Sequence, residues 1–386
     1  MIGRATARLA LAGVLVSSFM LPTATSAQEN PSVEDVRTAI GRGVSFLLED
    51  QNDDGSWGGY RKPRGPENHY WSNPGTHKAW TAATTGIVCT TFMNLGEDAP
   101  PDARASLDRG VDFLLESGLV KRVSEWDVDN TWGYVYGLEA AARALRHGRY
   151  QGTPREGKLR ELAEGLVARL RQHQTPGGGW GYYDDPPYTR RPKWATSFMT
   201  AAAILALVEA RDVGIDVPQK MIDRAARCLE HCRLPSGAYT YSIKPVPSPG
   251  GLTGIDQIKG SLGRIQVGNL ALRAAGRPIT LDDLRTGLDH FFRHHRFLAI
   301  GRGRPIPHEA YYAVAGYFFF FGHYYAARVI EALPAEERAA WEAKMQEKIL
   351  ECQEADGSMW DFHSHSYHRP QGTAWGIDIL KRSLGE

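Results

Sequence analysis

A short segment in the last third of the chain, residues 307–312, contains residue types that acid–base catalysis uses. Its candidate groups are His308, Glu309, Tyr311 and Tyr312. A His or Tyr that acts as base and acid, next to an Arg that neutralises a carboxylate, is what β-elimination from a uronic acid requires. Arg302 and Arg304 lie just upstream. The alternative is a helix start at which His308 and Glu309 cap backbone groups.

A second candidate is a pair of carboxylates, Asp127 and Asp129, which are separated by one residue and lie just before an apolar helical segment. Trp132 and Tyr136 follow, four residues apart, so they share one face of that helix and would present aromatic surface beside the carboxylates. Acidic residues also favour helix N-termini, where they cap backbone N–H groups and interact well with the helix dipole. Capping by Asp129 or Asn130 is therefore the alternative to chemistry.

The elements that would position these residues follow a repeat. The pattern Gln-x-x-x-Gly-x-Trp begins at Gln51 and again at Gln174. A third copy begins at Gln353 and has Met359 in place of Trp, and a fourth begins at Arg233 and keeps the Gly and an aromatic residue. The spacings fit a period of about 60 residues, which is typical of a repeat architecture.

Each period contains two kinds of predicted helix. The first kind is amphipathic, with apolar residues at helical spacing on one face, and we expect it at residues 33–49, 102–116, 155–172, 219–233, 281–295 and 336–352. The second kind is apolar or small nearly all round, and we expect it at residues 81–95, 131–145, 196–207, 261–275, 310–332 and 373–384.

This alternation predicts an all-α fold, a single α/α toroid of six helical hairpins with inner and outer rings. A helix without a polar face must be buried on all sides, so the apolar helices belong inside the amphipathic ones. An open solenoid is the alternative, but it would not require every second helix to be apolar all round. The recurring turn then follows each outer helix. Its Gly would end that helix in the left-handed conformation, and its Gln and Trp would pack against neighbouring outer helices.

The long connections all lie between an outer helix and the next inner one, so they gather at one rim, where a ligand site is expected. The further candidate substrate-binding residues at this rim are Trp80, Arg264 and His365. Trp suits stacking and Arg suits a carboxylate, so the rim has the polarity that a sugar or uronate would need. His365 lies near His363 and His368, and we interpret this group as hydrogen-bonding residues rather than as a metal site.

Residues 1–27 have the features of a secretory signal: Arg4 and Arg8, an apolar run, and small residues ending at Ala27. We therefore expect an exported protein, periplasmic or extracellular, whose residues 28–386 form one toroid domain. The formal net charge of the whole chain is only +1, so nucleic acid is not an expected partner. No other segment is apolar enough to make an integral membrane protein. We expect no metal and no cofactor, and the oligomeric state is left open.

The Gln-x-x-x-Gly-x-Trp turns on a double ring of helices resemble those of the squalene-hopene and oxidosqualene cyclases and, more loosely, protein prenyltransferase β subunits. Squalene cyclases have two such domains and this chain has one. Class II cyclases carry Asp-x-Asp-Asp-Thr, whose central Asp protonates an alkene or epoxide. Asp127 and Asp129 match this motif, whereas Asn130 departs from its third Asp. The prenyltransferase zinc ligands have no counterpart here.

The resemblance implies that Asp129 is an acid for alkene protonation in a dry cavity, with aromatic faces that stabilise carbocations by cation–π attraction. The leading hypothesis is therefore an exported terpene-cyclase-like protein that binds, and cyclises by protonation, a polyprenyl or triterpene chain. Two alternatives stay open: an exported polysaccharide lyase or hydrolase that acts on a carbohydrate polymer, and a non-catalytic binding module.

Overall fold

The computed structural model describes residues 31–59, 74–96, 99–124, 127–182, 194–243, 253–363 and 366–385, all within one compact unit, Pro31–Glu386. Within these ranges the secondary structure consists of thirteen α-helices, three short 3-10 helices and two isolated β-bridges, without a strand. The prediction of an all-α fold is confirmed.

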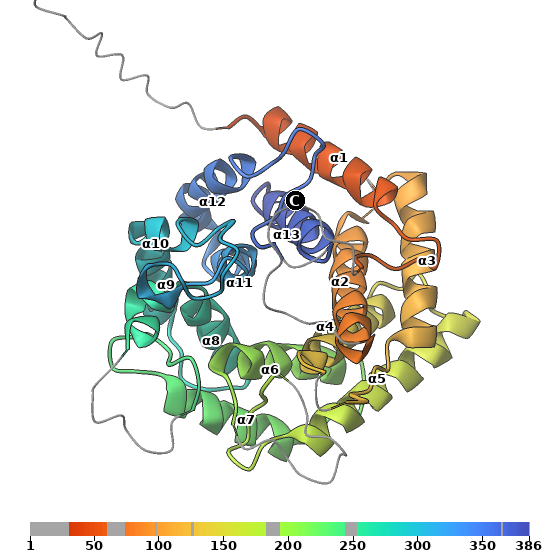
Figure 1. Ribbon diagram of the computed structural model, residues 1–386, viewed down its shortest axis with the longest axis horizontal. Coiled ribbons are helices and arrows are strands. Elements are labelled where there is room, and N and C mark those ends of the chain that lie inside the picture. The colour runs from red at the N-terminus through yellow and green to blue at the C-terminus, as the bar shows by residue number, and fades with distance from the viewer. Residues whose placement is uncertain are drawn as a thin grey trace, which may run out of the picture. The chain divides into compact units, whose positions relative to one another are not determined.

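The helices form two concentric rings (Figure 1). The outer ring consists of α1 (Val33–Glu49), α3 (Pro101–Ser117), α5 (Pro154–His173), α7 (Gln219–Cys232), α9 (Leu281–Arg293) and α12 (Ala335–Leu350). The inner ring consists of α2 (Pro74–Asn94), α4 (Asn130–Arg146), α6 (Ser197–Asp212), α8 (Leu262–Ala274), α11 (Phe318–Glu331) and α13 (His368–Arg382). The short α10 (His295–Ala299) follows α9.

The inner ring is closed. Each inner helix contacts the next one along the chain, and α13 contacts α2. Nearly every residue of α6 is buried, because this helix packs against both neighbours in the ring and against the outer helix α7. The outer helix α5 buries only one face, which runs from Leu159 to Leu170. These patterns of burial confirm the single α/α toroid with inner and outer rings.

The recurring turn after one outer helix is hydrogen-bonded to the next outer helix. After α5, Gln174 Nε2 donates hydrogen bonds to the carbonyl of Gly178 (2.6 Å) in its own turn and to that of Met221 (2.9 Å) in α7. Trp180 Nε1 donates to the Leu170 carbonyl at 2.8 Å, and the Trp180 side chain is almost fully buried. The Gln and Trp therefore brace the outer ring.

We expected the Gly of the turn to end the outer helix, but it lies beyond the end of that helix. Helix α5 ends at His173, and Gly178 lies five residues later with φ of 99°. A Cβ at Gly178 would lie 2.3 Å from the backbone oxygen of Arg224 in the next outer helix. The position requires Gly because of both its left-handed backbone and this close approach.

One inner helix begins later than predicted. We expected a helix over residues 310–332, but α11 starts at Phe318. The preceding residues form a 3-10 turn, Tyr311–Ala313, in which Tyr312 and Ala313 have φ of 60° and 52°. Left-handed residues cannot continue a right-handed helix, so the segment that begins at His308 is a loop and not a helix start.

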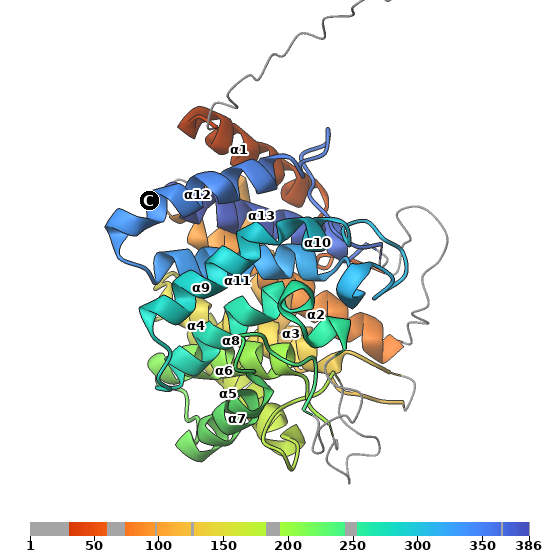
Figure 2. The ribbon, with the colours of Figure 1, turned by 90° about the vertical axis from the view of Figure 1, so that its left-hand side faces the viewer.

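Figure 2 shows the rings from the side, with α10 lying at the end of the molecule where α2 begins. None of the described helices is both long and apolar enough to cross a membrane.

Candidate functional site

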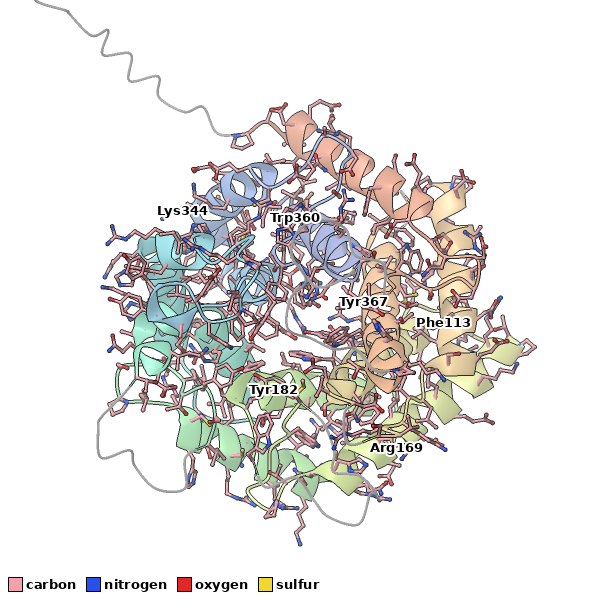
Figure 3. The ribbon with its side chains drawn as sticks, in the orientation of Figure 1. Phe113, Arg169, Tyr182, Lys344, Trp360 and Tyr367 are labelled. Carbon is pink, nitrogen blue, oxygen red and sulfur yellow. The ribbon has the colours of Figure 1, made fainter. Side chains whose placement is uncertain are left out.

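A cavity of about 370 Å³ lies among the inner helices. Side chains converge around the middle of the ring, among them Tyr182 and Tyr367 (Figure 3). The aromatic lining residues are Trp80, Trp132, Tyr136, Tyr182, Phe198, Tyr241, Tyr317, Phe318, Phe321, Phe362, Tyr367 and Trp375. The other lining residues are Ala83, Thr84, Ile87, Val128, Asp129, His308, His368 and Gln371. Within the described part of the chain, Asp129 is the one carboxylate in this lining, and no Arg or Lys borders it.

Asp129 faces this cavity instead of capping a helix. It occupies the N-cap position of α4, but its side chain makes no capping hydrogen bond. Its φ of 63° is left-handed, which is uncommon for a residue other than Gly, although Asp adopts it more often than most. The Trp80 side chain from α2 hydrogen-bonds to the Asp129 carboxylate. The sequence alternative in which Asp129 serves as an N-cap does not match this geometry.

The surroundings of Asp129 favour its protonated form. Burial raises the pKa of Asp129 to about 7, and the hydrogen bond from Trp80 opposes part of that rise. The side chain keeps some solvent exposure because it borders the cavity, but the walls around it are mostly aromatic. A carboxyl group in this state can hold a proton near neutral pH and then donate it.

Asp127 has a different role from its neighbour. Its buried carboxylate accepts hydrogen bonds from the backbone N–H groups of Thr76 (3.2 Å), Val123 (3.1 Å) and Ser124 (2.9 Å). It thereby fixes the first turn of α2 against the loop that leads to α4, and it does not line the cavity. The expectation that both carboxylates serve one catalytic site does not match the geometry.

The wall beside Asp129 is built from stacked rings. Trp132 and Tyr136 stack with their ring centres 5.6 Å apart and an interplanar angle of 4°. Trp132 also lies 6.0 Å from Phe198, which packs edge-on against Phe318 at 5.2 Å. Such faces attract a cation by their quadrupole. The expected pairing of Trp132 and Tyr136 on one helix face is present in the structure.

Hydroxyl and imidazole groups form a hydrogen-bonded chain along another part of the lining. Tyr182 contacts Tyr241 through their hydroxyl groups, and Tyr241 hydrogen-bonds to Tyr317. The Tyr317 hydroxyl lies 2.9 Å from His308 Nε2, and His308 Nδ1 lies 2.7 Å from the Ala313 carbonyl. Because that carbonyl can only accept, His308 Nδ1 carries the hydrogen and Nε2 accepts from Tyr317. Burial lowers the pKa of His308, which favours its neutral form.

A second histidine, His368, also lines the cavity. Its Nδ1 lies 3.1 Å from Asp361 Oδ1, and Asp361 Oδ2 accepts the backbone N–H of Phe320 at 2.9 Å. Asp361 is buried, with an exposed fraction of 2%. Sequence reasoning placed His368 only in a group of rim histidines, because its partnership with Asp361 depends on a loop whose path the sequence does not reveal.

The other predicted site residues lie away from the lining. Glu309 and Tyr311 are exposed, and the Tyr312 hydroxyl lies 3.2 Å from Lys259 Nζ. We expected Glu309, Tyr311 and Tyr312 to share one site, but none of them lines the cavity. They belong to the left-handed loop, which turns them away from the lining. His365 lies outside the described residues.

Arg264 packs against two aromatic residues of the cavity lining. Its guanidinium group donates to the backbone carbonyls of Tyr239 and Ile255 and lies 5.5 Å from the ring centre of Tyr241 and 5.8 Å from that of Phe318. Burial lowers the pKa of Arg264 to about 10. The prediction of a substrate-binding Arg264 is not matched by its geometry, since its hydrogen bonds go to the backbone and it does not line the cavity.

The sequence matches the family model of the squalene-hopene cyclase C-terminal domain over residues 20–239, which is more than half of the chain. A search of curated protein sequences found no match.

Several solved structures share the fold. The type II terpene cyclase MstE from Scytonema, in complex with merosterolic acid A, is 15% identical, with a TM-score of 0.56, and the match covers 92% of this chain and 98% of that one. An α-1,6-mannanase of Salegentibacter is 12% identical, with a TM-score of 0.59 and coverage of 91% and 99%. A cellobiose 2-epimerase from Spirochaeta thermophila is 12% identical, with a TM-score of 0.58 and coverage of 93% and 100%. At these identities the likeness shows the toroid fold alone.

Proposed function

The chain belongs to the squalene-hopene cyclase C-terminal domain family, and we propose that it cyclises a polyprenyl or triterpene chain by protonating an alkene. The observation that carries the proposal is Asp129, a carboxyl group that makes no capping bond and borders an aromatic cavity. Its raised pKa, about 7, lets it hold near neutral pH the proton that it donates in the first step.

The first step needs a neutral carboxylic acid and an alkene in contact with it. Asp129 donates its proton to one alkene carbon, and the adjacent carbon becomes a cation. Trp132, Tyr136 and Phe198 stabilise that cation through their ring faces. The largely apolar lining limits the water that would otherwise intercept it.

The mostly aromatic lining of the cavity favours a lipid over a polysaccharide. Its volume of about 370 Å³ lies within the roughly 300–1,000 Å³ typical of ligand pockets. A uronate lyase needs a cation at the substrate carboxylate, and no Arg or Lys borders the described lining. Arg302, the nearest sequence candidate, donates to the backbone carbonyls of Trp360 and Cys352 instead.

A direct assay tests the proposal. The purified protein is incubated with squalene, geranylgeraniol and farnesol, and the extracts are analysed by gas chromatography and mass spectrometry. We expect a cyclic isomer of at least one substrate from the wild type and none from Asp129→Asn, with unchanged circular dichroism. His231→Ala, at the end of outer helix α7, is the matched control and should keep the activity.

Finding no isomer from any of these substrates would contradict the proposal, as would an equal yield from Asp129→Asn. We also propose that the protein is exported and cleaved near Ala27. Intact mass spectrometry of the protein recovered from outside the cytoplasm tests this, and a mass that includes residues 1–27 would contradict it.

A further inference from the structure

The cavity contains a histidine that the protonation step does not use. His368 is the first residue of α13, and its Nδ1 lies 3.1 Å from the buried carboxylate of Asp361. An ionised carboxylate only accepts hydrogen bonds, so this contact places the hydrogen of a neutral His368 on Nδ1. The lone pair is then on Nε2, for which the structure gives no hydrogen-bond partner among the described residues.

The second oxygen of Asp361 fixes the carboxylate from the other side. Asp361 Oδ2 accepts the backbone N–H of Phe320 in the first turn of α11, at 2.9 Å. His368 also packs edge-on against Phe362, with ring centres 5.4 Å apart. The imidazole is therefore held by α11, α13 and the loop between α12 and α13, with its side chain only 15% exposed.

The neighbouring polar groups are less suited to accept a proton. Both nitrogens of His308 are engaged, one by the Ala313 carbonyl and the other by the Tyr317 hydroxyl. Burial raises the pKa of Tyr241 and that of Tyr367 to about 12, which keeps both phenols neutral. Gln371 has no basic nitrogen.

We propose that His368, held by Asp361, is the general base that ends the reaction by removing a proton from the cyclised cation. The proposal rests on the proposed function, because it assigns a second catalytic residue in the same cavity. His368 is the catalytic residue that touches the substrate, and Asp361 is a positioning residue that acts through it.

The step balances without any further reactant. The C–H bond on the carbon next to the cation breaks, and its electron pair forms a new C=C bond. The proton goes to His368 Nε2, and Asp361 stabilises the resulting imidazolium. Without Asp361 this charge would be disfavoured at the N-terminus of α13, where the helix dipole is positive. Asp129 has lost one proton and His368 has gained one, so the net reaction is an isomerisation that yields an alkene.

Product analysis is the first test. His368→Gln should still consume substrate, because Asp129 is intact, but the single alkene of the wild type should give way to a mixture of alkene isomers or alcohols. Asp361→Asn should shift the products in the same direction, and Asp361→Glu should restore part of the wild-type pattern. His231→Ala should leave the product unchanged. The same single product from His368→Gln and from the wild type, at the same rate, would overturn the assignment.

Histidine NMR gives a test that does not need activity. Long-range ¹H–¹⁵N spectra of the intact protein, with His368 assigned by comparison with His368→Gln, should show the tautomer that is protonated on Nδ1. Asp361→Asn should lose that preference, whereas Asp129→Asn should keep it. A wild-type His368 protonated on Nε2 would overturn the proposal whether or not the protein converts an isoprenoid. A failed isoprenoid assay together with the expected tautomer would count against the proposed function alone.

Discussion

The acid role that we propose for Asp129 depends on what surrounds this residue. The sequence identified the residue, since Asp127-x-Asp129 precedes an inner helix, but it did not separate the two carboxylates. The structure separates them by their partners: three backbone N–H groups bind Asp127, whereas the Trp80 side chain binds Asp129 at the cavity. Asp129 borders the cavity and Asp127 does not, so we propose the acid role for Asp129 alone.

Trp80 should set the pH range of the reaction. Its hydrogen bond favours the ionised form of Asp129, so Trp80→Phe should raise the pKa of Asp129 further above about 7. The proposed reaction needs protonated Asp129, and its rate should therefore fall at a higher pH in Trp80→Phe than in the wild type. The measurement is the rate against pH for both proteins. An inflection that stays in place or moves to lower pH would contradict the role of Trp80.

The raised pKa of Asp129 should also appear in the stability of the protein. Between the ordinary carboxyl pKa and about 7, the folded protein holds a proton that the unfolded chain has lost, so the free energy of unfolding falls as pH rises through this range. Asp129→Asn cannot ionise. It should therefore be more stable than the wild type at pH 8, with a smaller difference at pH 5. Denaturant unfolding at both pH values checks this, and a larger advantage at pH 5 would refute it.

Among the helices, the periodicity of the sequence predicted the bounds well. The exception is the start of α11, which is explained by left-handed residues before it. The expected helix over residues 155–172 appears as α5, Pro154–His173. The expected start at Ala310 is wrong because Tyr312 and Ala313 are left-handed. Neither Tyr nor Ala is typical of a positive φ. The sequence therefore did not predict the loop that places His308 and Tyr317 at the cavity.

The recurring turn offers a clean test of its Gly. Gly178→Ala puts a Cβ 2.3 Å from the Arg224 carbonyl oxygen and forces an L-residue to φ of 99°. The left-handed backbone alone costs roughly 1–2 kcal/mol, so the free energy of unfolding should fall by at least that amount. Gly177→Ala is the matched control, because the atom nearest to its new Cβ would be Ile243 Cδ1 at 3.7 Å, an ordinary van der Waals distance. Equal stability of the two variants would contradict this account of the turn.

At the scale of the whole molecule, the chain closes on itself. Gln353 Nε2 donates to the Ala39 carbonyl of α1 at 2.8 Å, just as Gln51 Nε2 donates to the Ser106 carbonyl of α3 at 2.9 Å. The first bond joins the last hairpin to the first one, and the second joins consecutive hairpins. An open solenoid would have only bonds of the second kind.

Ring closure can be measured by comparing these two glutamines. Gln353→Ala and Gln51→Ala should each lower the free energy of unfolding by about 1–3 kcal/mol, because each removes one hydrogen bond to an outer helix and one within its own turn. Urea unfolding of both variants gives the comparison. A negligible effect of Gln353→Ala beside a clear effect of Gln51→Ala would contradict the closed ring.

The fold was predictable from the sequence because its helical hairpins repeat. The cavity was only partly predictable because the residues that line it do not follow the repeat. Trp80, Trp132 and Tyr136 lie on the first two inner helices, where helical spacing indicates what faces inward, and Asp129 directly precedes the second of these helices. Tyr182 reaches the same cavity from a connection, and His368 reaches it from the first position of α13, directly after another connection. Their contribution depends on loop geometry that residue spacing does not determine.

The central claim is that Asp129 delivers a proton to an isoprenoid alkene, and isotope transfer from solvent tests it most directly. The protein is equilibrated in D₂O, so that the Asp129 carboxyl group carries deuterium, and is then given squalene, geranylgeraniol or farnesol. We predict a cyclic isomer with one deuterium on the protonated carbon, and no such product from Asp129→Asn. A cyclic product without deuterium, or a labelled product formed equally by Asp129→Asn, would contradict the claim.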